Sequence, residues 1–197
     1  MAAESSKYTK IITDTAFALF KEKGYERVSI REICEAANVP RTSFYTCFSD
    51  KADILVHSLA AVKNNFLSMM PQFIDAPNDL ERIWFLSDSF LQLAVWYGPE
   101  LCKAIFMLEL NGECDLFDIL SDFNDWLAQL LANCQRAGIV GVKGDPHELI
   151  PLQLNLAKAV WLDWVRSGGA FPLQETVRRD IEIFLDVKSE YRSENRI

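Results

Sequence analysis

A short segment near the N-terminus concentrates side chains that donate hydrogen bonds. Its polar members are Arg41, Thr42, Ser43, Tyr45 and Thr46. Hydroxyl and guanidinium groups of this kind bind phosphate oxygens and base edges, and arginine pairs well with guanine. We therefore predict that this segment contacts a nucleic acid, with Arg41 as the residue that reads a base.

Such side chains need a rigid element to present them, and the surrounding sequence predicts two short helices. Ser29 opens a capping box, the pattern that starts a helix. Asn38 tolerates the left-handed conformation, and Pro40 cannot continue a helix already under way. The pattern predicts a helix over 29–37, a three-residue turn, and a second helix over 41–47.

Apolar residues in the same stretch can hold two short helices at a steep angle. They are Ile30, Ile33, Ala37, Val39, Phe44 and Phe48. A longer amphipathic helix, expected over about 6–23, precedes them and can support both. A long helix followed by two short helices and a tight turn is the layout of a helix-turn-helix.

The stretch from Ile12 to Lys51 resembles the N-terminal DNA-binding domain of the TetR family of bacterial transcription regulators. The matching pieces are Ala16-x-x-Leu19-Phe20-x-x-x-Gly24-Tyr25, Val28-Ser29-Ile30-Arg31-Glu32-Ile33, Ala36-Ala37-Asn38-Val39 and Thr42-Ser43-Phe44-Tyr45-x-x-Phe48-x-Asp50-Lys51. They cover about forty residues in unbroken order. The aromatic and glycine positions go beyond what helix periodicity alone requires.

The resemblance implies DNA-contacting roles for several of these residues. Tyr45 matches a phosphate-contacting tyrosine of the recognition helix, and Lys51 matches a lysine that opens the fourth helix and faces the DNA backbone. Thr42 and Ser43 match positions that approach bases or phosphates. Ser29 matches the cap of the second helix, whose N-terminus often touches phosphate.

Three positions depart from the family pattern. Pro40 stands where a serine or threonine cap is usual, which puts the cap hydrogen bond of the second short helix in doubt. Thr42 replaces a frequent glycine. Cys47 replaces a histidine or tyrosine, and a phosphate contact is lost with it. None of these changes disturbs the apolar residues between the helices.

The rest of the chain also has helical periodicity, broken by glycine, proline and asparagine. The further helices are expected over about 51–70, 78–97, 100–110, 114–136, 146–167 and 173–192. We therefore predict an all-α protein of about nine helices. Residues 1–51 form the helix-turn-helix domain, and residues 52–197 form a larger helical domain.

In the resembled family the larger domain binds a small molecule and forms a dimer through its last two long helices. Large apolar side chains could line such a pocket, and the candidates are Trp84, Phe106, Met107, Trp126 and Trp161. For the homodimer interface the candidates are Leu149, Leu156, Val160, Trp164, Val177, Ile181, Phe184 and Leu185.

Charge and cysteine usage narrow the class of protein. The net charge is −8, yet residues 1–55 carry eight basic and eight acidic side chains, so the acidic excess lies entirely beyond them. An odd count of five cysteines without a C-x-x-C pair, and only two histidines, disfavours a disulfide framework or a zinc site. We expect a cytoplasmic protein without a metal, a cofactor or a membrane span.

These patterns together predict a ligand-responsive transcription regulator. We expect a repressor that binds a palindromic DNA operator as a homodimer and is released by a small-molecule effector. A thiol-sensing regulator is the first alternative, with Cys47 as the sensor because it would lie near DNA. A helical enzyme is the second, although no G-x-S-x-G, phosphate-binding glycine loop or H-E-x-x-H motif is present.

Overall fold

The computed structural model describes the backbone of residues 2–114 and 118–192, and the side chains of 7–59, 69–114 and 123–192. In this part of the chain every named element is a helix, as the sequence predicts. The elements are α1 (Ala2–Lys23), η1 (Tyr25–Arg27), α2 (Ile30–Ala37), α3 (Arg41–Cys47), α4 (Lys51–Asp75), α5 (Asp79–Leu110), α6 (Asp118–Arg136), α7 (Pro146–Arg166), α8 (Leu173–Phe184) and η2 (Ser189–Tyr191).

The chain divides into two compact units. Unit 1 comprises residues 1–65 and 100–116, and unit 2 comprises residues 66–99 and 117–197. Two of the three divisions fall inside helices, within α4 and within α5, and the third, between residues 116 and 117, lies outside the described residues. The functional boundary expected after residue 51 coincides with the start of α4 and stays a prediction, since compactness alone places residues 52–65 with the N-terminal helices.

The break inside α5 was expected from the sequence. Two helices were predicted there, over 78–97 and 100–110, and Gly98 between them has a φ of 76° and a ψ of 166°. A positive φ of this kind favours glycine, and Pro99 cannot donate a backbone hydrogen bond. The prediction of two helical segments is therefore confirmed, although the second begins without a connecting loop.

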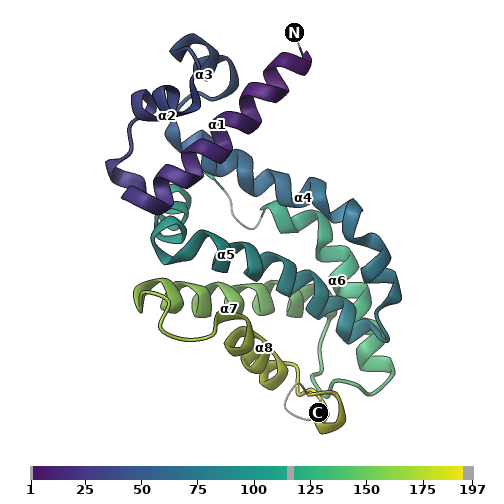
Figure 1. The fold of residues 1–197 in the computed structure, drawn as a ribbon. Coiled ribbons are helices and arrows are strands. Elements are labelled where there is room, and N and C mark those ends of the chain that lie inside the picture. The colour runs from purple at the N-terminus through teal and green to yellow at the C-terminus, as the bar shows by residue number, and fades with distance from the viewer. Residues whose placement is uncertain (1, 115–117, 193–197) are drawn as a thin grey trace. The chain divides into compact units, whose positions relative to one another are not determined.

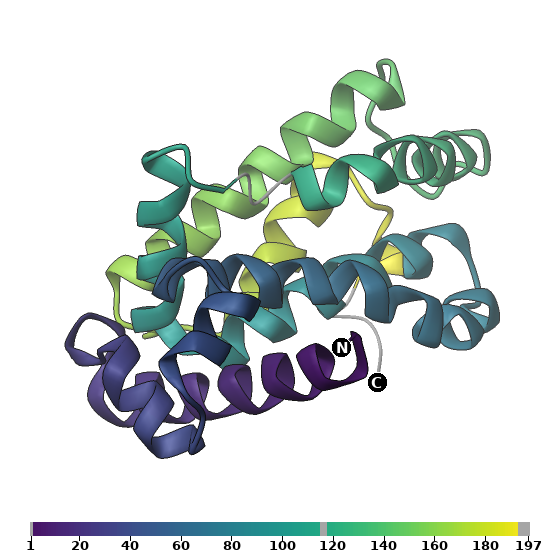
Figure 2. The same cartoon turned by 90° about the horizontal axis from the view of Figure 1, so that it is seen from above.

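Unit 1 is organised around α1. This helix packs against η1, α2 and α3, and α2 packs against α3. Figures 1 and 2 show the two short helices folded together beside α1. The buried core of unit 1 includes Ile12, Ala16, Phe20, Ile33, Val39, Phe44 and Phe48. Ile33, Phe44 and Phe48, which the sequence predicts between the two short helices, are thus among the most deeply buried side chains in the unit.

Unit 2 is built on α7, which packs against α6 on one side and α8 on the other (Figure 1). A single antiparallel bridge between Val140 and Val187 joins the loop before α7 to the segment after α8. Both α7 and α8, which pack together, contribute buried apolar residues, among them Val160, Trp164, Val177 and Ile181.

That packing corrects the predicted dimer interface. Six of its eight residues are buried inside one protomer, at 8% exposure or less. These are Leu149, Val160, Trp164, Val177, Ile181 and Leu185. Leu156 and Phe184 are half-buried. The apolar stripe on each helix was identified correctly, but it faces the protomer's own core, so a partner cannot cover most of it.

No helix in the described part of the chain is long and apolar enough to span a membrane. Among the same residues, no group of three histidine, cysteine, aspartate or glutamate side chains is placed to hold a metal ion. None of the five cysteines, all of which the structure describes, forms a disulfide, and Cys34, Cys102 and Cys134 are buried.

Candidate nucleic-acid interface

The N-terminus of α2 carries the capping box that the sequence predicts. The backbone N–H of Glu32 donates to Ser29 Oγ at 3.2 Å, and the backbone N–H of Ser29 donates to Glu32 Oε2 at 2.9 Å. The Ser29 hydroxyl also donates to that carboxylate, at 2.9 Å. Ser29 is exposed, but its hydrogen-bonding groups are already engaged, so a phosphate at this helix end competes with Glu32.

The turn between α2 and α3 has the conformation that Asn38 was expected to adopt. Its φ of 53° and ψ of 47° are left-handed, and its N–H donates to Glu35 O at 3.2 Å. Pro40 is the N-cap of α3 and makes no side-chain hydrogen bond. Its carbonyl accepts from the N–H groups of Ser43 and Phe44, at 2.9 and 3.2 Å. The loss of the usual cap bond at Pro40 is therefore confirmed.

The outward face of α3 presents most of the predicted DNA-binding side chains. Arg41, Thr42, Tyr45 and Thr46 are exposed, with Tyr45 at 51%, while Ser43 is half-buried. An Arg41 guanidinium N–H donates to the Tyr45 hydroxyl at 3.4 Å, one helical turn away. This places a cation and a phenol side by side on one surface.

Two further features of α3 bear on DNA binding. The Thr46 hydroxyl donates to Thr42 O at 2.9 Å, so its donor is committed within the helix. Residues 36–49 contain no carboxylate, so α3 brings no negative charge of its own toward a phosphate. Among the predicted residues, Arg41, Thr42 and Tyr45 are thus the most available for DNA.

Lys51 is placed differently from what the family resemblance implies. Its ammonium donates to the backbone carbonyls of Tyr25 and Val28, at 2.7 and 3.1 Å, and lies 4.1 Å from the centre of the Tyr25 ring. Burial lowers the pKa of Lys51, and it raises the pKa of Tyr25 to about 12. Sequence reasoning missed these partners because they lie more than twenty residues away.

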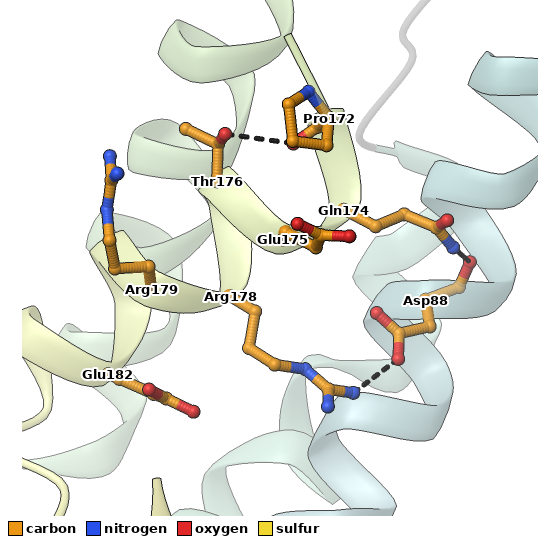
Figure 3. Close-up of a pocket in the computed structure, with 8 residues that line it drawn as sticks. All are labelled: Asp88, Pro172, Gln174, Glu175, Thr176, Arg178, Arg179 and Glu182. Carbon is orange, nitrogen blue, oxygen red and sulfur yellow. Dashed lines mark hydrogen bonds and ion pairs between the residues drawn. The ribbon is translucent and has the colours of Figure 1, made fainter. Parts of the chain in front are cut away.

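Unit 2 contains a separate cleft between α5 and α8 with a volume of about 600 Å³. Figure 3 shows Arg178 and Gln174 reaching from α8 toward Asp88 on α5. Arg178 forms an ion pair with the Asp88 carboxylate, and Gln174 Nε2 donates to the Asp88 backbone carbonyl at 3.3 Å. Glu175 and Glu182 also line the cleft. The sequence analysis predicted a pocket lined by large apolar side chains, so it missed this charged lining.

The predicted pocket residues do not form one site within either unit. Phe106 and Met107 belong to unit 1, whereas Trp84, Trp126 and Trp161 belong to unit 2. Met107 and Trp126 are about half exposed, at 50% and 48%, and the other three are buried. Trp84 adjoins the charged cleft, because the Arg178 guanidinium lies 5.3 Å from the centre of its ring.

Comparison with known proteins finds a family that matches the helix-turn-helix segment. Residues 12–57 match the profile of bacterial regulatory proteins of the tetR family, a range that includes α2, the turn and α3. The segment that carries the helix-turn-helix is therefore similar to bacterial regulatory proteins of the tetR family.

Two proteins that are similar to most of this chain are transcriptional regulators themselves. The transcriptional regulator AcuR of Cereibacter sphaeroides is 29% identical over 154 residues, which are 73% of this chain and 66% of AcuR. The chain thus spans just under two thirds of that relative. A TetR-family regulator from Pectobacterium atrosepticum is 19% identical, with a TM-score of 0.69 over 94% of this chain and 95% of its own.

A third similar protein was solved with a small molecule. FadR of Bacillus subtilis, in complex with stearoyl-CoA, is 19% identical and has a TM-score of 0.64 over 89% of this chain and 97% of its own. At this identity the likeness supports the fold. The comparisons favour neither the thiol-sensing regulator nor the enzyme that the sequence left open.

Proposed function

We propose that this chain is a ligand-responsive transcriptional repressor. Two copies would each insert α3 into successive major grooves of a palindromic operator. The observation that carries this proposal is the exposed face of α3, where Arg41, Thr42 and Tyr45 project from a helix held by the buried Phe44 and Phe48. A rigid helix with donors on its outer face can read base edges while it binds phosphates.

The first experiment measures binding of the protein to DNA from upstream of its own gene. A scrambled sequence of equal length is the control, and the affinity is followed over a salt series. Tight, sequence-dependent binding that weakens steeply with salt is expected, because neutralised phosphates release counterions. Equal affinity for the upstream DNA, for the scrambled control and for every member of a library of candidate operators would contradict the proposal.

The dimer that this function needs requires an exposed apolar surface in unit 2. On α7, Leu152 and Leu162 are 54% and 42% exposed, and on α8, Ile183 is 63% exposed. Leu152 and Leu162 lie on one face with the exposed Asn155 and Ala159, at spacings of three and four residues. We propose that this surface, rather than the buried residues first predicted, meets the second copy.

For the effector, we propose a small molecule with a charged group that binds in the cleft between α5 and α8. FadR of Bacillus subtilis holds stearoyl-CoA, but the cleft here is lined by Asp88, Glu175, Arg178 and Glu182. Charged walls favour ion-paired ligand groups over an acyl chain. A ligand that breaks the Asp88–Arg178 pair would remove a contact that links α5 to α8. Beyond Gly98, α5 continues into residues of unit 1.

Thermal shift assays with small carboxylates, small amines and stearoyl-CoA test this site. We expect a charged small molecule to raise the Tm of the wild-type protein and to release the operator. Neither effect is expected in Arg178→Met, while Val95→Thr on the exposed face of α5 is the matched control. Stabilisation by stearoyl-CoA that is equal in all three proteins would place the effector site elsewhere.

A further inference from the structure

Lys51 connects two points of the chain that enclose the whole helix-turn-helix. It is the first residue of α4, which follows α3 after a short connection. Its ammonium donates to the carbonyls of Tyr25 and Val28, which lie 26 and 23 residues earlier. Val28 immediately precedes Ser29, the N-cap of α2. The side chain therefore joins the start of the helix-turn-helix to its end.

The segment that Lys51 holds is a tight turn that also packs against α1, and Val28 at its end is buried. It enters through Gly24, whose φ is 84°, and forms the short helix η1 over Tyr25–Arg27. The ring of Tyr25 packs edge-on against Phe20 of α1, with 5.0 Å between ring centres. The turn also borders a cavity of about 230 Å³, whose far wall is formed by Glu100, Lys103, Ala104 and Met107. The side of the turn that faces this cavity is not packed, so the polar contacts of Lys51 add to the restraint that packing against α1 supplies.

The ammonium of Lys51 is poorly placed to bind a DNA phosphate at the same time. An ammonium has three N–H donors, and two of them are directed at the Tyr25 and Val28 carbonyls. The Tyr25 ring lies within cation–π distance of the same nitrogen. Lys51 is half-buried, and this burial lowers its pKa. Moving to a phosphate would leave two carbonyls without this donor.

We propose that Lys51 is a positioning residue, which fixes α2 and α3 by holding the Tyr25–Val28 turn against α4 and does not itself contact DNA. This proposal rests on the DNA-binding function proposed above. In this role Lys51 affects DNA binding by holding the recognition helix α3 in position. A residue that contacts phosphate would instead bind the DNA directly. The two roles differ in their dependence on salt.

The test compares Lys51→Met and Lys51→Arg with the wild-type protein, and the exposed Lys10→Met on α1 is the control. Operator affinity is measured over a salt series, at least 10 °C below the Tm of each variant. For Lys51→Met we expect about a tenfold loss of affinity with an unchanged salt slope, because no phosphate contact is removed. Lys51→Arg is expected to lose affinity too, since a planar guanidinium does not reproduce an ammonium between two carbonyls and a ring.

Three results would overturn the proposal. A fall of about 0.9 in the salt slope of Lys51→Met, with full affinity in Lys51→Arg, would show a phosphate contact. A lower Tm with unchanged operator affinity would show a role in stability alone. Unchanged amide hydrogen exchange at residues 24–29 in Lys51→Met would show that the side chain does not restrain the turn. This last measurement needs no DNA, so it separates failure of the proposal from failure of the repressor function.

Discussion

Arg41 and Tyr45 lie one turn apart on the exposed face of α3, and their contact is long at 3.4 Å. A contact of this length is easily exchanged for a base edge or a phosphate. The two residues nevertheless have different chemistry. The planar guanidinium can pair with two acceptors of guanine, whereas the phenol offers one hydroxyl.

At the residue scale we therefore predict that Arg41→Ala weakens operator binding by about 1–3 kcal/mol and relaxes sequence preference at one position of each half-site. Competition between operators with single base changes measures this. Thr46→Val is the control, because the Thr46 hydroxyl is already bound to the Thr42 carbonyl. A uniform loss across all competitors, with a shallower salt slope, would show that Arg41 binds phosphate instead.

At the element scale, α2 depends on an exposed carboxylate. The backbone N–H of Ser29, its hydroxyl and Lys23 hold the pKa of Glu32 below its usual range. A carboxyl whose pKa is lowered on folding stabilises the folded state above its unfolded pKa. That contribution is lost as the pH falls through the pKa of the folded state.

We predict that the stability advantage of the wild-type protein over Glu32→Gln is largest near neutral pH and shrinks as the pH falls below about 4.5. Urea unfolding of both proteins between pH 7 and pH 3 measures it. Glu35→Gln, on the exposed side of α2, is the control, although its ion pair with Arg31 contributes a small effect of its own. A difference that stays constant over this range would contradict a contribution from the ionised carboxylate, since glutamine can also accept the capping hydrogen bond.

The ion pair between Asp88 and Arg178 links two helices, α5 and α8. Burial raises the pKa of Asp88 even though Arg178 opposes the shift, so the carboxylate depends on this partner. The side chains of Arg178 and Asp88 are 24% and 36% exposed, which limits the strength of the pair. A double-mutant cycle separates the pair from its surroundings.

For this cycle we predict a coupling of about 1 kcal/mol between Asp88→Asn and Arg178→Gln in urea unfolding. Arg178→Gln alone should be the more damaging change, because it leaves a partly buried carboxylate without its cation and also removes the contact with the Trp84 ring. Additive effects of the two substitutions would mean that the ion pair does not join the two helices.

At the scale of the whole molecule, the proposed repressor function needs two recognition helices held at a fixed spacing. We predict that Leu162→Glu or Ile183→Glu shifts the protein toward monomers and lowers operator affinity at least tenfold, because the two half-sites are no longer bound together. Sedimentation velocity measures the oligomeric state. Val95→Glu, at a position that is 47% exposed on α5, is the matched control. A dimer that survives both substitutions would place the interface on another surface.

The sequence by itself determined the local structure of the helix-turn-helix. The capping box at Ser29, the left-handed Asn38 and the uncapped α3 behind Pro40 all depend on residues within a few positions of one another. Local hydrogen bonds and backbone sterics decide such features, so spacing along the chain is sufficient to predict them. The break at Gly98 was predictable for the same reason.

Only the tertiary structure decided which faces meet and which partners distant side chains find. The apolar stripes of α7 and α8 were visible in the sequence, but periodicity cannot tell a face buried in the same protomer from a face left for a partner. Lys51 and Tyr25 are far apart in the chain, as are Asp88 and Arg178, and nothing in their local sequence marks either pair. Their contacts arise from packing between helices, which depends on the whole chain.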